Sequence, residues 1–149
     1  MTETDIDLAG AIPIQEGEFR KPVLQLATLA ETHPLLQSSA ACHTLIRVNN
    51  QLSGYSIDRK MFDATKWDFA DGPAGVNPNY GIETPFIVSS PLWDAEKRQS
   101  SSHPAVEIGV LKRFPFESNV KRTTVRLNIT GLLQMVIYFN GKTMFPSRR

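Results

Sequence analysis

The spacing of apolar and small side chains predicts a first helix from about Pro34 to Thr44. One face of this helix would carry the residues that recur every three or four positions, Leu35, Ser39, Cys42 and Ile46. Thr32 stands just ahead of Pro34, and a capping side chain followed by proline in the first turn is typical of a helix start. We therefore expect Thr32 to cap this helix.

A second helix is predicted in the sequence SIDRKMFDATKWDF, which begins at residue 56. Ser56 is the candidate N-cap, because its hydroxyl can accept a hydrogen bond from an unpaired N–H of the first turn. Ile57, Met61 and Ala64 recur at i, i+4 and i+7, which is the spacing of a buried stripe. Asp58 would then lie in the first turn, where the helix dipole favours a carboxylate.

The other segments of the first hundred residues have strand and loop patterns. Residues 1 to 30 place short apolar pairs between glycines and prolines, which favours an extended strand and turns over a helix. The sequence LIRVNNQLSG indicates two short strands around an Asn49-Asn50 turn. Residues 70 to 85 and 89 to 104 are rich in turn-forming and charged residues, so we expect loops, or one long insertion that holds a short strand at TPFIV.

Beyond Pro104 the pattern alternates with a period of two, as in half-buried strands. The apolar residues of like parity are Val106, Ile108, Val110, Phe114 and Phe116, and, further along, Val125, Leu127 and Ile129. Asn140-Gly141 is a hairpin turn signal. Adjacent strands joined by short turns predict an α+β fold with a twisted, mainly antiparallel sheet flanked by helices.

Composition adds limits to this picture. With 149 residues, of which 41% are hydrophobic, the chain is long enough for one soluble domain with its own core. Cys42 is the only cysteine, so a disulfide framework is excluded, and no apolar run approaches the ~20 residues of a membrane-spanning helix.

Charge is distributed unevenly along the sequence, although the formal net charge is only +1. Residues 1 to 71 hold ten acidic and six basic residues, whereas residues 72 to 149 hold five acidic and ten basic ones. An anionic ligand would therefore bind mainly to the second half. The alternative is that each half solvates its own surface and the two charges merely compensate.

A catalytic constellation is not evident. Cys42 and His43 are neighbours, but adjacent residues on a helix point about 100° apart, and a lone buried cysteine behaves as a small hydrophobe. The three histidines are scattered without metal-ligand spacing, and the chain lacks both G-x-x-x-x-G-K and G-x-G-x-x-G phosphate-binding patterns. We expect no catalytic residue and no metal site in this chain.

The segment from Lys112 to Arg122, KRFPFESNVKR, places two aromatic residues among four cations. This combination suits an aromatic base that stacks and a phosphate chain that is neutralised. Pro115 disfavours a central ladder position, so Phe116 is expected near a strand end. Two alternatives stay open: a strand with solvated basic residues and phenylalanines in the core, or a binding surface for single-stranded nucleic acid.

Three blocks together resemble the nucleotide-binding domain of type V P-type ATPases, a branch linked to polyamine and cation transport. They are AACHTL at 40–45, GYSIDRKMFDATKW at 54–67 and RFPFESNVKRTTV at 113–125. The family has ATCHSL, then a block of the form G-D-P-x-x-L-K-M-F-E-A-T-G-W, then R-F-P-F-S-S-A-L-K-R-M-S-V, in the same order. Met1-Thr2-Glu3 resembles the end of the family's phosphorylation string, which begins D-K-T-G-T.

The resemblance implies a single nucleotide-binding domain fragment over residues 1–149. Residues 1–30 would lead in from the phosphorylation motif, 70–104 would form a loop-rich insertion, and 128–149 would be a divergent tail, which leaves the domain incomplete at its C-terminal end. The phosphorylated aspartate and the domain that binds Mg²⁺ would lie outside this sequence. The chain alone is therefore expected not to hydrolyse ATP.

The resemblance also assigns ATP contacts residue by residue. Phe116 would stack on adenine, Lys121 would face the polar side of the nucleotide, and Asp58 would lie near the adenine amino group, with Arg122 as a weaker candidate. Tyr55-Ser56 stands where the family has Asp-Pro, and Glu117 stands where a serine is usual. Both departures are expected to weaken nucleotide binding.

The implied parent protein is an ATP-driven translocase for cations or polyamines on an intracellular, endosomal or lysosomal, membrane. This segment would lie on the cytosolic face, where its partners would be ATP and the remaining domains of the ATPase, with no nucleic acid and no membrane contact of its own. The alternative function is a non-catalytic interaction module, from a truncated or spliced form that no longer binds nucleotide.

Overall fold

A computed structural model describes residues 8–91, 105–117, 119, 122–129 and 132–141, and for 115–117, 122–124, 126–128 and 132–141 it describes the backbone alone. Five strands form the main sheet in the order β11-β10-β9-β8-β5, and every neighbouring pair is antiparallel. Their bounds are Asp68–Asp71 for β5, Phe86–Ser89 for β8, Glu107–Glu117 for β9, Arg122–Ile129 for β10 and Leu132–Gly141 for β11. The predicted α+β class and the antiparallel sheet are confirmed.

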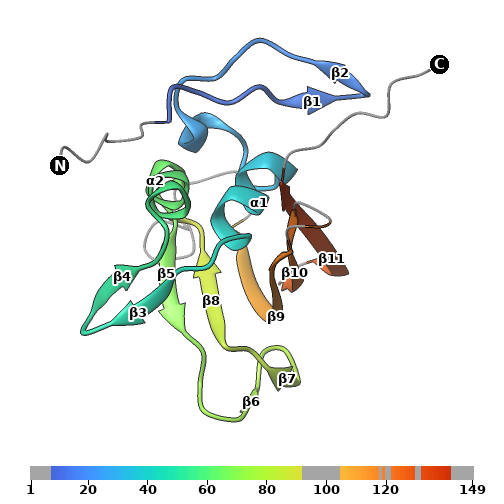
Figure 1. The fold of residues 1–149 in the computed structure, drawn as a ribbon. Coiled ribbons are helices and arrows are strands. Elements are labelled where there is room, and N and C mark those ends of the chain that lie inside the picture. The colour runs from blue at the N-terminus through green and yellow to red at the C-terminus, as the bar shows by residue number, and fades with distance from the viewer. Residues whose placement is uncertain (1–7, 92–104, 118, 120–121, 130–131, 142–149) are drawn as a thin grey trace, which may run out of the picture.

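Two helices accompany the sheet, α1 at Pro34–Ala41 and α2 at Ser56–Thr65, and they pack against each other. Three separate hairpins surround this body: β1 Ile14–Gln15 with β2 Glu18–Phe19, β3 Ile46–Val48 with β4 Gln51–Ser53, and β6 Val76–Asn77 with β7 Ile82–Glu83. A short 3₁₀ helix at Leu26–Thr28 leads into α1. Figure 1 shows the β1–β2 hairpin beyond the helices and the β6–β7 hairpin at the opposite end of the molecule.

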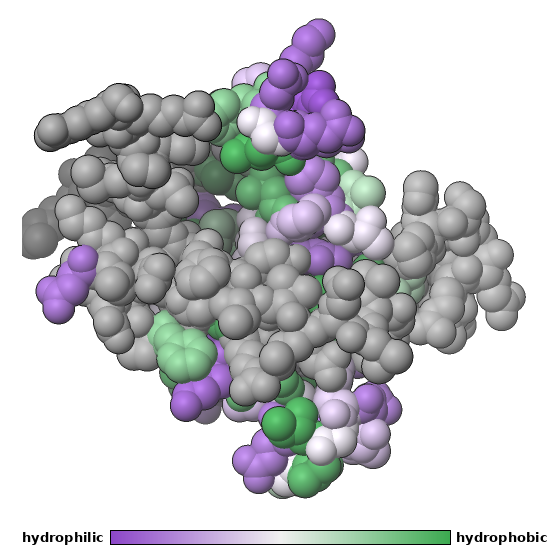
Figure 2. Space-filling view, turned by 90° about the vertical axis from the view of Figure 1, so that its right-hand side faces the viewer, coloured by the Kyte–Doolittle hydropathy of each residue, from purple (hydrophilic) through white to green (hydrophobic). Residues whose placement is uncertain are grey.

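Half of the exposed large apolar side chains among the described residues lie on these hairpins. They include Ile14 and Phe19, Ile46 and Val48, and Val76 and Ile82. In Figure 2 hydrophobic and hydrophilic residues are mixed at the lower end of the molecule, where Figure 1 places β6 and β7. The buried core lies instead between the two helices and strands β5, β8 and β9.

Helix α1 starts at Pro34 as predicted, but its capping residue and its last residue differ from the prediction. His33, not Thr32, is its N-cap, because the Nδ1 atom of His33 accepts a hydrogen bond from the Leu35 N–H at 3.1 Å. The helix ends at Ala41, since Cys42 leaves the helical conformation. Ile46 consequently lies in β3 and is half exposed, so it does not share the helix face with Leu35.

Helix α2 begins at Ser56, one residue before the start that a Ser56 cap predicts, and its buried stripe is displaced by one residue. Its buried residues are Asp58, Phe62 and Thr65, whereas Ile57 of the predicted stripe is 59% exposed. The N-cap is Tyr55 instead of Ser56, and its side chain makes no capping hydrogen bond. The prediction failed because it assumed that an apolar residue occupies each inward position, and here a carboxylate occupies the first one.

The Asn140-Gly141 hairpin is also absent, because both residues belong to β11. Asn140 pairs with Thr123 and Gly141 pairs with Arg122 of β10. The long-range ladder with β10 therefore overrides a local turn preference. Pro115 is accommodated in β9 because β8 pairs only as far as Val110, and because the register with β10 shifts opposite Pro115.

The predicted Asn49-Asn50 turn is confirmed, and it joins β3 to β4. Asn49 has φ 50° and Asn50 has φ 62°, the left-handed conformation that a two-residue hairpin turn of type I′ requires. The turn fixes the register in which Ile46 lies opposite Ser53. Both of these residues reappear below as walls of a cavity.

Replacing Asn50 by glycine should stabilise this hairpin. Glycine reaches positive φ without the steric penalty of a side chain, so Asn50→Gly is expected to raise the free energy of unfolding by about 0.5 kcal/mol. Asn50→Val should lower it by about 1 kcal/mol or more, because a β-branched residue is strained in this conformation. Urea unfolding curves measure both changes, and a glycine variant less stable than wild type would contradict the turn assignment.

Candidate functional site

A polar tie joins the segment after α1 to the first turn of α2. The Asp58 carboxylate is only 8% exposed, and its Oδ2 atom accepts hydrogen bonds from the Thr44 N–H at 2.8 Å and from the Thr44 Oγ1 hydroxyl at 2.6 Å. A buried carboxylate with two donors is strongly held. Thr44 is therefore a structural partner of Asp58. Both hydrogen bonds go to Oδ2, and neither goes to Oδ1.

A second tie joins β9 to the same segment. Arg113 donates a hydrogen bond from Nη1 to the backbone oxygen of Leu45 at 2.8 Å, and its guanidinium lies 4.7 Å from the centre of the Phe86 ring. Burial lowers the pKa of Arg113 from its usual value. Arg113 and Asp58 thus bind the backbone of two consecutive residues, Leu45 and Thr44.

His43 lies between these ties and is 1% exposed. Its ring stacks on Phe86 with centroids 5.4 Å apart and meets Phe62 edge-on at 5.2 Å. Burial and, to a smaller extent, the Arg113 charge lower the pKa of His43 to about 4, and the Asp58 charge partly opposes them. The imidazole is therefore neutral at neutral pH, and it carries its proton on Nε2 because Nδ1 accepts from the Leu45 N–H at 3.2 Å.

These contacts give His43 and Cys42 structural roles. Cys42 is 1% exposed in the core, as expected for a lone apolar thiol. Among the described residues, His43 Nε2 has no hydrogen-bond partner. A neutral buried imidazole packed among phenylalanines fills the core and orients Leu45.

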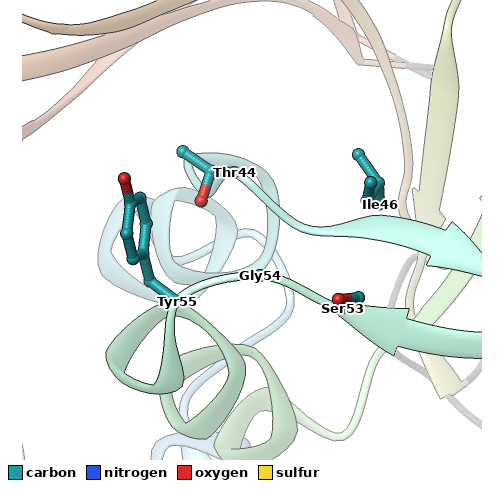
Figure 3. Close-up of a pocket in the computed structure, with 5 residues that line it drawn as sticks. All are labelled: Thr44, Ile46, Ser53, Gly54 and Tyr55. Atoms are coloured by element: carbon teal, nitrogen blue, oxygen red, sulfur yellow. The ribbon is translucent and has the colours of Figure 1, made fainter.

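A cavity of about 370 Å³ opens on the other side of Thr44 and is open to solvent. Its lining residues come from the end of the α1 segment, from both strands of the β3–β4 hairpin and from the start of α2: Thr44, Ile46, Ser53, Gly54 and Tyr55 (Figure 3). Gly54 passes against Leu45, where a Cβ atom would lie 2.9 Å from Leu45 Cδ2. A larger residue at 54 would push the β4–α2 connection away from the tie at Thr44.

The structure describes the predicted nucleotide contacts to different extents. Asp58 is buried and does not line the cavity itself. It hydrogen-bonds to Thr44, which does. Phe116 lies near the end of β9 and Arg122 begins β10 opposite Glu117, so their backbones share one end of the β9–β10 pair. The side chains of Phe116 and Arg122, and all of Lys121, lie outside the described residues.

Thr44, Arg113 and Tyr55 were not among the predicted site residues. The signal for Thr44 and Arg113 was their presence in the blocks AACHTL and RFPFESNVKRTTV. Only the fold shows that they bind a buried carboxylate and a backbone carbonyl, respectively. Within the described ranges, no group of three or more His, Cys, Asp or Glu side chains is placed to hold a metal ion, and neither α1 nor α2 is long and apolar enough to cross a membrane.

Comparison with known proteins finds relatives of this chain. No family model matches the chain. It is 30% identical over 141 residues to the human polyamine-transporting ATPase 13A2, an alignment that covers 95% of this chain and 12% of that protein. It is 28% identical over 150 residues to the mouse probable cation-transporting ATPase 13A5, and 25% identical over 151 residues to the human polyamine-transporting ATPase 13A3.

The chain spans about 12% of the length of these relatives, and the alignments cover 95 to 99% of its own length. It is therefore homologous to one segment of the type V P-type ATPases, as its three sequence blocks indicated.

Removing the Asp58 carboxylate should destabilise the fold. Asp58→Ala leaves the Thr44 N–H and hydroxyl without their shared acceptor, so we expect a loss of about 2–3 kcal/mol in the free energy of unfolding. Asp63→Ala is the matched control, because its carboxylate is exposed and pairs only with Arg59 on the helix surface, where the loss should stay near or below about 0.5 kcal/mol. Equal losses in chemical denaturation would show that the tie contributes nothing beyond a surface charge.

The stability of the fold should also decrease as the pH is lowered, because of His43. The folded-state pKa is about 4, below the ordinary 6.5, so the unfolded chain binds more protons between these values. This stability is complete above pH 6.5 and is lost progressively as the pH falls toward 4. Between pH 7.5 and pH 5 the expected loss is about 2 kcal/mol.

Urea unfolding of wild type and His43→Phe across that pH range isolates this contribution. Phenylalanine keeps a ring against Phe86 and cannot be protonated, so the variant should show a smaller slope of stability against pH. Parallel slopes would mean that His43 does not titrate as its burial implies.

Proposed function

We propose that this chain is the nucleotide-binding part of a type V P-type ATPase and holds ATP for phosphoryl transfer to an aspartate outside this sequence. The observation that carries the proposal is the meeting of the three family-like blocks at one place. Asp58 from the second block and Arg113 from the third bind Thr44 and Leu45 of the first. Residues 68 apart in sequence, Leu45 and Arg113, thus meet next to Thr44, which lines one open cavity.

The chemistry of the proposed contacts fits a nucleotide. Phe116 near the end of β9 offers a stacking face, and Lys121 and Arg122 provide cations that neutralise phosphate. The Asp58 Oδ1 atom, which takes neither Thr44 bond, is the acceptor for the adenine amino group. The basic second half of the chain provides the positive field for an anionic ligand.

Hydrolysis and transport belong to the whole protein in this proposal. An aspartyl-phosphate route needs an aspartate nucleophile and Mg²⁺, and the described residues contain no acidic cluster for that ion. We place both in another domain of the ATPase, on the cytosolic side of an endosomal or lysosomal membrane. The relatives are named for polyamine and cation transport, so the cargo of the whole protein is proposed to be of that class.

The proposal includes the specific nucleotide-binding domain fold of this family for residues 1–149. In this division residues 1–30 lead in from the phosphorylation motif, 70–104 form an insertion and 128–149 form a divergent tail. The described strands β6 and β7 lie within that insertion, as does β8, which includes the last three residues of the predicted short strand at TPFIV.

Nuclear magnetic resonance titration with ATP tests the proposal. A base pocket without the second domain should bind at around mM, which corresponds to about −4 kcal/mol. Amide signals around Asp58 and Phe116 should shift together at several mM ATP. Phe116→Ala should abolish the shifts, whereas Phe114→Ala, which removes an exposed ring two residues earlier in the same strand, should preserve them.

The titration also separates the alternatives. A chain that melts cooperatively and gives no shift at several mM ATP would refute the nucleotide role and favour the non-catalytic interaction module. Single-stranded nucleic acid is the third possibility, and it predicts an affinity that falls steeply with salt. A strong salt-dependent response to oligonucleotides with none to ATP would select that reading.

A further inference from the structure

Tyr55 occupies an unusual position for an aromatic residue. It is the N-cap of α2, its side chain is 70% exposed, and it makes no capping hydrogen bond. In Figure 3 its ring stands at one side of the cavity, Thr44 lies next to it, and Ile46 lies on the far side. Exposed rings at the mouth of a cavity are commonly binding groups, because their faces are free to stack.

We infer that Tyr55 forms a stacking wall of this cavity for a purine base, and that it binds the base in addition to the proposed contact of Phe116. The inference rests on the proposed function for the nucleotide, and it adds the place of the base and a residue that the family resemblance does not assign. Tyr55 stands where the family has aspartate, and the inference reverses the expectation that this departure weakens binding.

The remaining walls suit a flat, apolar ring. Ile46 is 50% exposed and offers an apolar surface opposite Tyr55, and Gly54 between them has no side chain to occupy the space. The hollow has a volume of about 370 Å³ and is largely open to solvent, so a bound base would be covered by the protein on one side only.

The polar side of the base would face the Thr44–Asp58 tie. Thr44 lines the cavity, and its hydroxyl donates to Asp58 Oδ2 at 2.6 Å, so the buried carboxylate lies directly behind the wall that Thr44 forms. A purine carries an exocyclic amine or ring N–H beside a stacking face. The proposed nucleotide supplies such a base, and Asp58 is the proposed acceptor for its amino group, which is why we assign a purine to the cavity.

The test uses the full chain with adenosine, ATP and ribose 5-phosphate as probes, and follows the methyl signals of Ile46 and Thr44. Adenosine and ATP should both shift the Ile46 methyls upfield by ring current, and ribose 5-phosphate should not. Because base stacking on an aromatic ring is worth ~1–3 kcal/mol, Tyr55→Ala should weaken adenosine binding at least about fivefold. Tyr55→Phe should bind within about twofold of wild type.

Two further variants distinguish the loss of the aromatic face from a loss of folding. Tyr55→Leu keeps apolar bulk without an aromatic face and should weaken binding like alanine, even if the alanine variant were poorly folded. Phe19→Ala removes an exposed ring on the separate β1–β2 hairpin and should change nothing. Thermal melts of each variant confirm that the fold is intact.

Each outcome has a distinct meaning. Adenosine affinity unchanged in Tyr55→Ala and Tyr55→Leu overturns the inference, and so do shifts that avoid Ile46. ATP binding that needs Phe116 but not Tyr55 preserves the proposed function and overturns only the role of Tyr55. Adenosine binding at Ile46 without any ATP binding supports the cavity as a base site and refutes the ATP function.

Discussion

The fold of this chain depends on one buried carboxylate. Asp58 enters the structure on the first inward position of α2, where its Oδ2 atom binds both the N–H and the hydroxyl of Thr44. That contact fixes where the chain turns after α1 and how α2 begins. It also fixes the wall that Thr44 contributes to the cavity, together with the β3–β4 hairpin and the 54–55 connection.

The charges around this carboxylate explain the neighbouring packing. Arg113 binds the next residue along, Leu45, and its guanidinium lies over the Phe86 ring, while the neutral His43 ring stacks on the same phenylalanine. The positively charged Arg113 of β9 and the negatively charged Asp58 of α2 thus bind the same short segment, residues 44 and 45. The residues that determine the fold here also form the edge of the proposed nucleotide site, so stability and binding are coupled at Thr44.

Sequence patterns predicted the elements where periodicity or turn chemistry was strong. The Asn49-Asn50 hairpin, the helix near residue 56 and the antiparallel strands after Pro104 follow from such patterns. The stripe of α2 was misassigned because hydrophobic periodicity cannot recognise a carboxylate whose partner is 14 residues away. Asn140-Gly141 was misassigned because a local turn preference cannot weigh a ladder with a distant strand.

The candidate site shows the same division. Asp58 and Phe116 were predicted from the resemblance of whole blocks. The cavity and the role of Tyr55 could not be predicted in this way, because the walls of the cavity come from three elements that only the fold brings together. The central claim is that these blocks form one nucleotide site. The most direct test is to record intermolecular nuclear Overhauser effects between bound ATP and the chain. We predict contacts from the adenine H2 and H8 protons to the Ile46 and Thr44 methyls, and saturable ATP binding whose contacts all lie outside residues 40–46, 54–67 and 113–125 would contradict this site.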